Sequence, residues 1–410
     1  MNSIIVFAIP FFFLTIGIEL LAGYIKKKKY YSFNDAITNL NIGIGSQTIG
    51  LISALVVLGV YDLLYRNAGQ LNIPKDNPFV WIGTLIVFDC IYYWAHRWAH
   101  EWNVMWGAHI VHHQSEEYNL SVALRQSWFH GLLSFWMFLP LAIIGVPTEV
   151  MAGVSGFVTL FQYWIHTEAI DKMPRWFEFI FNTPSHHRVH HATNPQYLDK
   201  NYAAVFIFWD RIFGTFEPEK EKPTYGITVG HTSLDPIYAN VHYYKEMVIG
   251  AQKEKSLWKK LALVFKSPAY LGNLIKEYYV AQPQKPAAPV SMNMRMYVLF
   301  QFITLSVGLV KFILAFEQLD WFYRIGCLCL VMLTIQSCGY ILENKTKRFP
   351  LEIIRLVGAG VLLNTLYYEH YQGWFTFMLV LSLVVGILST SWFVYENYIK
   401  RKDPVKVQNT

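Results

Sequence analysis

Nine long apolar runs constrain this chain more than any other feature of its sequence. Hydrophobic residues make up 54% of its 410 residues, a larger share than soluble domains usually carry. Each run approaches the roughly 20 residues that an α-helix needs to cross a bilayer. We therefore predict an all-α polytopic membrane helical bundle of about nine transmembrane spans. The runs are Ile4–Tyr24, Gly45–Leu64, Phe79–Ala95, Trp128–Gly145, Pro147–Ile165, Met296–Phe316, Trp321–Leu342, Leu351–Tyr368 and Trp374–Tyr395.

The positive charge of the chain follows its apolar runs. The net charge is +6, and Lys26–Lys29 come directly after the first run. Further basic residues follow the seventh and ninth runs: Lys345, Lys347, Arg348, Lys400, Arg401, Lys402 and Lys406. Basic loops mark the cytoplasmic side of a membrane, so nine spans place the N-terminus outside and the C-terminus inside. We expect a multi-pass protein of the bacterial inner membrane or the endoplasmic reticulum, and no nucleic-acid partner, because no compact basic domain is present.

The runs and the polar segments divide the chain near residue 290. Residues 1–290 are predicted to form a catalytic membrane core with a cytosolic segment, and residues 291–410 a C-terminal transmembrane region. Gln282–Val290 reads as a linker rich in proline and alanine. Trp209–Phe216 reads as an amphipathic stretch at the membrane interface. The four cysteines lie in apolar runs without C-x-x-C spacing, so no thiolate metal site or disulfide framework is predicted.

Eight histidines form three tight clusters, HRWAH, HIVHH and HRVHH. They are His96, His100, His109, His112, His113, His187, His190 and His191. Spacings of three and four residues bring side chains to one face of a helix. Neutral imidazole is a common metal ligand, and one ion takes about four protein ligands. Counting spans places all three clusters on the cytoplasmic side, where the sequence therefore predicts a histidine-rich site for two metal ions.

Other histidines are weaker candidates. His166 ends the fifth apolar run on the side of the clusters and is a predicted ninth ligand. Adjacent helical residues point about 100° apart, so only one of His186 and His187 easily joins the cluster face, and we favour His187. His186 and His130 stay open as further ligands. The isolated histidines are expected to be ordinary: His231, His242 and His370.

Polar residues next to the clusters are candidates for orienting the ligands. Glu101 directly follows His100, and carboxylates often hold a ligating imidazole through its second nitrogen. Asn194, Asp199 and Asn201 closely follow the third cluster and are candidates for the same role. The alternative interpretation of Glu101 is a surface carboxylate beside Arg97.

The ligand type favours iron. Structural zinc prefers cysteine, and hydrolytic zinc uses three ligands and water, whereas eight histidines suit a redox pair of irons. A metal pair at the membrane surface, under apolar helices, suggests oxygen chemistry on a lipid chain. The alternative from another functional class is a metal or proton transporter. The histidines of a transporter would lie near the middle of the bilayer, but the middle of each run in this chain is apolar.

At these residues the chain resembles the fatty acid hydroxylase and sterol desaturase superfamily of membrane di-iron enzymes. The pattern H-x3-H, H-x2-H-H, H-x2-H-H is matched at all eight positions. The segments at 96–127, 182–202 and 209–216 look like the alkylglycerol monooxygenase branch of that superfamily. Glu101 matches a glutamate that the branch carries beside its first cluster. Beyond residue 290 the resemblance is architectural only.

The resemblance implies oxidative cleavage of an ether lipid. Two Fe ions activate O2, the carbon next to the ether oxygen is hydroxylated, and the hemiacetal collapses to a fatty aldehyde and a glycerol derivative. The implied reductant is tetrahydrobiopterin, although no pterin-binding motif is legible in the sequence. The alternative within the superfamily is a hydroxylase or desaturase of a sterol, fatty acyl chain, sphingoid base or carotenoid.

Overall fold

The computed structural model describes residues 2–228, 232–281, 289–345, 347 and 349–399. This part of the chain is helical and contains no strand, only two isolated bridges, which pair Phe181 with Phe206 and Ala192 with Tyr225. The prediction of an all-α protein is confirmed. Most of the predicted linker, His231, Arg348 and the basic residues that follow the last run lie outside the described residues.

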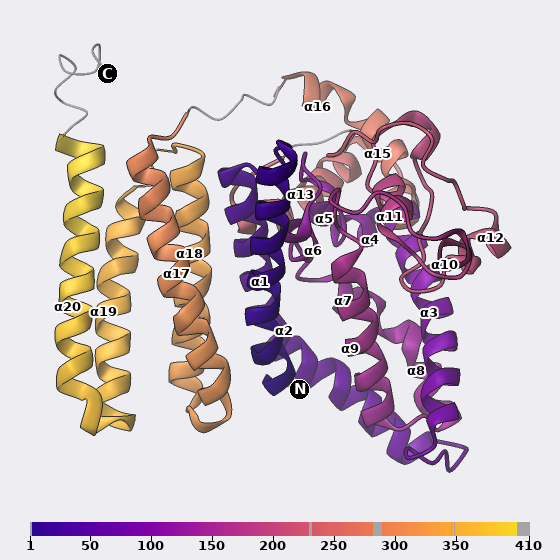
Figure 1. The fold of residues 1–410 in the computed structure, drawn as a ribbon, viewed down its shortest axis with the longest axis horizontal. Coiled ribbons are helices and arrows are strands. Elements are labelled where there is room, and N and C mark those ends of the chain that lie inside the picture. Colours follow the sequence, from indigo (N-terminus) through magenta and orange to yellow (C-terminus); the bar gives the residue numbers. More distant parts are fainter. Residues whose placement is uncertain (1, 229–231, 282–288, 346, 348, 400–410) are drawn as a thin grey trace. The chain divides into compact units, whose positions relative to one another are not determined.

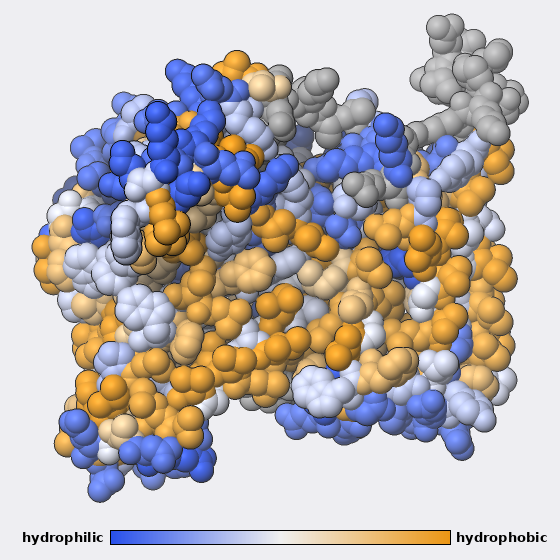
Figure 2. Space-filling model, turned by 180° about the vertical axis from the view of Figure 1, so that it is seen from behind, coloured by the Kyte–Doolittle hydropathy of each residue, from blue (hydrophilic) through white to orange (hydrophobic). Residues whose placement is uncertain are grey.

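Among the residues that the structure describes, seven helices are long and apolar enough to cross a membrane. The chain is therefore a multi-pass membrane protein. The helices are α1 (Asn2–Lys26), α2 (Phe33–Ala68), α3 (Pro78–Glu101), α17 (Met292–Ala315), α18 (Trp321–Leu342), α19 (Pro350–His370) and α20 (Gln372–Val394). Figure 2 shows, on the face that it displays, apolar side chains gathered between two hydrophilic zones.

The predicted count of nine spans is not confirmed, because the fourth and fifth runs form shorter helices. The fourth run breaks into α7 (His130–Ser134), a 3₁₀ turn (Phe135–Phe138) and α8 (Leu139–Ile144). The fifth forms α9 (Thr148–Trp164), whose 17 residues extend about 25 Å, less than the roughly 30 Å of hydrocarbon. Apolar composition alone does not report such interruptions.

The described chain divides into two compact units. One contains residues Met1–Phe11, Ser233–Ile237 and Lys285–Thr410. In this unit, α17 packs on α18 and α20, and α19 packs on the other sides of α18 and α20, so the four helices form a closed ring. A buried ion pair between Arg355 and Glu352 stabilises this bundle, and Ser337 donates to Glu352 at 2.6 Å.

The other unit comprises Phe12–Thr232 and Tyr238–Gln284. Its long helices α2 and α3 pack against α8 and α9. Short helices gather at the end where α3 terminates (Figure 1). These are α4 (Asn103–Gly107), α5 (Ile110–His113), α6 (Leu120–Ala123), α10 (Arg175–Ile180), α11 (Pro184–His190), α12 (Phe208–Phe213), α13 (Pro236–Lys253), α14 (Leu257–Ala262), α15 (Pro268–Leu274) and α16 (Lys276–Ala281).

Two glycines of α2 let the segment after α6 approach closely. A Cβ atom on Gly43 would lie 2.5 Å from the carbonyl oxygen of Leu124, and one on Gly45 would lie 2.4 Å from the ring of Trp128. The Trp128 indole also donates to the Ile42 carbonyl at 3.0 Å. This segment supports the histidine-rich end of the unit, so its close contacts with α2 help to hold the histidine site in position.

Gly43→Ala is therefore expected to lower the midpoint of thermal unfolding in detergent. The new methyl group forces two backbones apart, which costs about 1–3 kcal/mol. Gly50→Ala is the matched control, because a Cβ there meets nothing within 4 Å and alanine favours a helix by up to about 1 kcal/mol over glycine. Equal midpoints for the two variants would contradict this account of the packing.

Candidate metal centre

Nine buried or half-buried histidines form two groups of potential metal ligands. Within each group, one nitrogen per imidazole lies within 4.8 Å of the corresponding nitrogens of the others. The first group is His96, His100, His109, His113 and His190, and the second is His112, His166, His187 and His191. These are the nine histidines predicted as ligands, and the structure brings all of them together.

Adjacent histidines of the second and third clusters go to different groups. His109 and His113 are four residues apart and share the first group, whereas His112 belongs to the second. In α11, His187 joins the second group and His190 the first. Neighbouring helical residues point about 100° apart, so an H-H pair can supply two ions at once. Each H-x2-H-H cluster therefore serves both groups, not the single face expected from its spacing.

Imidazole nitrogens meet closely inside each group. In the first, the Nε2 atom of His109 lies 3.0 Å from that of His96 and 3.1 Å from that of His113. In the second, the Nε2 atom of His166 lies 3.2 Å from that of His112 and 3.1 Å from that of His187. In each group, these nitrogens converge on one point, which gives two points in all.

The two groups adjoin. The rings of His113 and His191 stack with centroids 4.3 Å apart, although they belong to different groups. The rings of His109 and His112 are 5.4 Å apart. Two ions held in these groups would be neighbours, as in dinuclear sites whose metals lie about 3.5–4 Å apart.

Backbone carbonyls orient several of the imidazoles from behind. The Nδ1 atom of His96 lies 2.7 Å from the Tyr202 carbonyl oxygen, and that of His190 lies 3.0 Å from the Lys200 carbonyl oxygen. The Nδ1 atoms of His112 and His166 face the carbonyl oxygens of Arg125 and Gln162, respectively. A hydrogen bond from Nδ1–H fixes the tautomer that leaves the Nε2 lone pair free for a metal.

Burial keeps these histidines neutral. Removal from water lowers the pKa of His112 to about 4 and the pKa of His190 to about 3. The same cause, with repulsion between neighbouring imidazoles, also lowers the pKa of His109, His113, His166, His187 and His191. Metal ligation requires the neutral imidazole, so its lone pair is available at physiological pH.

The donor set fits a pair of metal ions. A metal–nitrogen distance of about 2.1 Å places neighbouring ligand nitrogens about 3.0–3.4 Å apart for angles between 90° and the tetrahedral angle. The close nitrogen pairs of the two groups, 3.0–3.2 Å apart, fall in this range. The buried Nε2 atoms of His100, His190 and His191 have no hydrogen-bond partner. Unpaired buried acceptors are costly, and a bound ion removes that cost.

Comparisons with known proteins agree with this geometry. The family model described as fatty acid hydroxylase matches residues 81–215, which contain all nine histidines. Alkylglycerol monooxygenase of Danio rerio is 33% identical over 410 residues, covering 98% of this chain and 91% of that protein. Alkylglycerol monooxygenase of Homo sapiens is 35% identical over 356 residues, covering 85% of this chain and 80% of that protein. The chain belongs to the alkylglycerol monooxygenase family.

More distant relatives match a smaller share of this alkylglycerol monooxygenase family member. Lathosterol oxidase of Mus musculus is 27% identical over 168 residues, covering 40% of this chain and 54% of that protein. No solved structure matches the chain.

The polar residues predicted to orient the ligands contact other partners. The carboxylate of Glu101 pairs with the Arg97 guanidinium at 2.8 Å. Asn194 accepts the backbone N–H of Thr224 at 2.8 Å, and Asp199 lies 3.4 Å from the Tyr202 hydroxyl. In this family member, four of the nine imidazoles have a backbone carbonyl within hydrogen-bond reach of Nδ1.

Three further candidates lie near the centre but outside both groups. Asn201 donates to the backbone carbonyls of His186 and Glu217. The Nδ1 atom of His186 lies 3.3 Å from the Thr183 hydroxyl, so its ring turns away from that of His187. The ring of His130 lies 5.3 Å from the ring of His109, but no nitrogen of His130 joins either group.

Two buried aspartates that sequence reasoning missed hold the loop beside His96. Asp210 accepts the backbone N–H groups of Tyr202 and Ala203 at 2.8 and 2.9 Å. Asp89 accepts those of Val205 and Phe206, both at 2.9 Å. Each carboxylate fixes two successive amides of the loop that presents the Tyr202 carbonyl. The signal in the sequence is an aspartate inside an otherwise apolar run, which lipid does not tolerate without a partner.

Arg125 is the third residue that sequence reasoning missed. It is fully buried and donates to the Val111 carbonyl at 2.6 Å, to Asn39 at 2.9 Å and to Gln114 at 2.8 Å. Its own carbonyl faces His112. The planar guanidinium thus fastens α5, which carries His112, to the segment behind it.

Proposed function

We propose that this protein is a membrane di-iron monooxygenase that cleaves the ether bond of alkylglycerol lipids with O2. The observation that carries the proposal is the pair of adjoining all-histidine groups, whose close nitrogen pairs have the spacing of neighbouring ligands on one ion. Imidazole ligands suit iron, and open positions on such an ion support oxygen chemistry. Membership of the alkylglycerol monooxygenase family supports the choice of substrate.

The reaction balances as a two-electron monooxygenation. O2, two electrons and two protons convert the C–H bond next to the ether oxygen to C–OH, and the second oxygen atom leaves as water. The resulting hemiacetal breaks its C–O bond to give a fatty aldehyde and a glycerol hydroxyl. Bound iron supplies the activation of O2. Tetrahydrobiopterin is the proposed source of the electrons, as the family resemblance implies.

The protein's own residues position this chemistry. The nine histidines would hold the two ions, and the carbonyls behind His96, His112, His166 and His190 keep their Nε2 atoms directed inward. Burial of these rings excludes bulk water from the reacting centre. We assign positioning roles at the rim to Glu101, Asn194 and Asp199, with Glu101 acting through its ion pair with Arg97.

The active site is proposed to face the cytoplasm, in the bacterial inner membrane or the endoplasmic reticulum. Lys26–Lys29 follow α1, and basic segments favour the cytoplasmic side. Helices α2 and α3 cross out and back, so the histidines at the end of α3 return to the side of these lysines. A reduction of the span count by two leaves this parity unchanged. Residues 1–290 are proposed as the catalytic core and residues 291–410 as a separate helical region.

Product analysis with labelled oxygen tests the proposal. Purified protein carrying two irons, incubated with an alkylglycerol, a tetrahydropterin and ¹⁸O2, is expected to release a fatty aldehyde labelled with one ¹⁸O, and the label is retained if the aldehyde is reduced at once. The freed glycerol hydroxyl is expected to stay unlabelled. If the ether lipid stays intact and a sterol or acyl lipid is oxidised under the same conditions, the ether-lipid substrate is wrong and the alternative within the superfamily is supported.

A further inference from the structure

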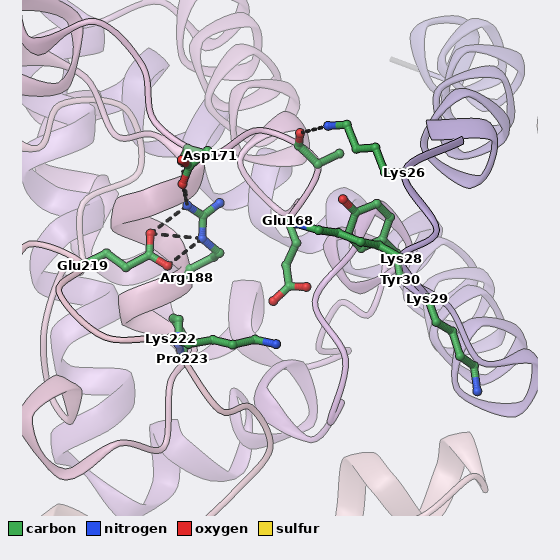
Figure 3. A pocket seen from close by; sticks show the side chains of 11 residues that line it. Lys26, Lys28, Lys29, Tyr30, Glu168, Asp171, Arg188, Glu219, Lys222 and Pro223 are labelled. Carbon is green, nitrogen blue, oxygen red and sulfur yellow. Dashed lines mark hydrogen bonds and ion pairs between the residues drawn. The ribbon is translucent and has the colours of Figure 1, made fainter. Parts of the chain in front are cut away.

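A polar cavity lies beyond the end of α1 (Figure 3). Two hollows of about 530 and 520 Å³ adjoin there and share Lys29, Tyr30, Glu168 and Lys222 in their walls. Both belong to the unit that contains the histidines. Such volumes suit a small molecule, whose sites range over roughly 300–1,000 Å³. The lipid chemistry proposed above makes no use of this cavity.

The aromatic ring of Tyr118 separates the cavity from the metal centre. Tyr118 lines the second hollow together with Tyr225, and the two rings stack with centroids 5.0 Å apart. The Tyr118 ring also stacks on His166 at 5.7 Å and lies 5.3 Å from His191. Its hydroxyl donates to the Ile165 carbonyl at 3.0 Å, which fixes the ring in place. One aromatic layer therefore divides a ligand in the cavity from the second histidine group.

Tyr30 brings an unpaired polar group to the cavity wall. Its side chain is only 6% exposed, and its hydroxyl has no hydrogen-bond partner. A buried hydroxyl without a partner destabilises the folded protein. The backbone carbonyl of Tyr30 accepts from Asn119 at 2.7 Å, so the residue is held where it is. A ligand with a polar atom in the cavity would satisfy this hydroxyl.

The charges around the cavity favour a small polar ligand over an alkyl chain. Arg188 is already paired with Glu219 at 2.7 Å. Glu168 accepts the Tyr225 hydroxyl at 3.0 Å, and its carboxylate faces the cavity opposite Lys222 in Figure 3. An alkyl chain would take these charged groups out of water without offering them a new polar partner. A flat ring system with N–H donors would bind the carboxylate and stack beside the tyrosines.

We propose that this cavity binds the reductant, a reduced pterin, next to Tyr118; this assignment rests on the proposed function. The aminopyrimidinone ring of a pterin is flat and presents neighbouring N–H donors, which a carboxylate such as that of Glu168 accepts as a pair. The Tyr30 hydroxyl would bond to a polar atom of the same ring. The tetrahydropterin gives up two electrons and two protons and becomes a dihydropterin, which supplies the reducing equivalents that the monooxygenation consumes.

Binding of 7,8-dihydrobiopterin, measured by equilibrium dialysis with the full-length iron-loaded protein, tests this assignment without turnover. Glu168→Gln is expected to weaken binding at least about 10-fold, since hydrogen bonds to a charged group contribute about 1.5–3 kcal/mol. Tyr30→Phe is expected to weaken it about 2- to 10-fold, the range for a neutral hydrogen bond. The matched controls are Glu221→Gln and Tyr24→Phe, neither of which lines the cavity.

The iron content and the KM for the alkylglycerol should stay unchanged in both cavity variants. Unchanged pterin affinity in both variants would overturn the assignment, and so would a raised KM for the alkylglycerol with normal pterin affinity, which would make the cavity a site for the lipid head group. If the wild-type protein binds the pterin in a Glu168-dependent manner but leaves alkylglycerols intact, the proposed substrate fails and the assignment of the cavity stands.

Discussion

His109→Ala is expected to abolish the monooxygenase activity and to reduce the iron content from two ions per chain to one or fewer. The Nε2 atom of His109 lies within 3.1 Å of the Nε2 atoms of both His96 and His113, so its removal opens the middle of the first group. Activation of O2 by metal contributes several kcal/mol to the rate, and the loss should reach at least about 10³-fold. Iron analysis of the purified protein and aldehyde release provide the two measurements.

His370→Ala is the control for this experiment. His370 ends α19, lies 3.8 Å from Asp320 and belongs to neither histidine group. This variant should keep its iron and its activity. Full iron content and full activity in His109→Ala would show that the first histidine group is not the metal centre.

Asp210→Asn is expected to lower the activity by about 10- to 100-fold, the range for changes to groups that orient metal ligands. The carboxylate of Asp210 accepts two backbone N–H groups, from Tyr202 and Ala203, and the Thr215 hydroxyl. An amide at this place turns an NH2 group toward one of those donors. The loop then shifts, and with it the Tyr202 carbonyl that lies 2.7 Å from the Nδ1 atom of His96.

Two measurements separate a shifted loop from a misfolded protein. Iron should leave Asp210→Asn faster than wild type in the presence of a chelator, while the protein still elutes as a folded species in detergent. Asp76→Asn, an exposed position before α3, is the matched control and should behave as wild type. A variant at Asp210 that keeps both its activity and its rate of iron loss would show that the loop holds its place without this carboxylate.

The sequence predicted the helical membrane fold and the nine histidines that the structure gathers. It did so because metal ligands and apolar runs are local patterns. It did not predict how the clusters divide, since the 100° rotation between His112 and His113 sends them to different groups only once α5 is placed between them. The joint role of Asp89 and Asp210 was also out of reach, because the amides that they accept lie in a loop far from Asp89 in the chain.

The span count shows a different limit. Composition reports how apolar a segment is, but it reports neither the break at Phe135–Phe138 nor the 17-residue length of α9. The orienting groups show the same limit. Any residue supplies a backbone carbonyl, so the carbonyls of Tyr202 and Lys200 behind the imidazoles leave no trace in side-chain identity.

Two short helices, α5 and α11, each contribute imidazoles to both groups. An ion bound in one group would therefore also restrain imidazole-bearing helices of the other. We expect the second ion to bind more tightly than the first, so that chains with a single metal are scarce when iron is titrated into the protein.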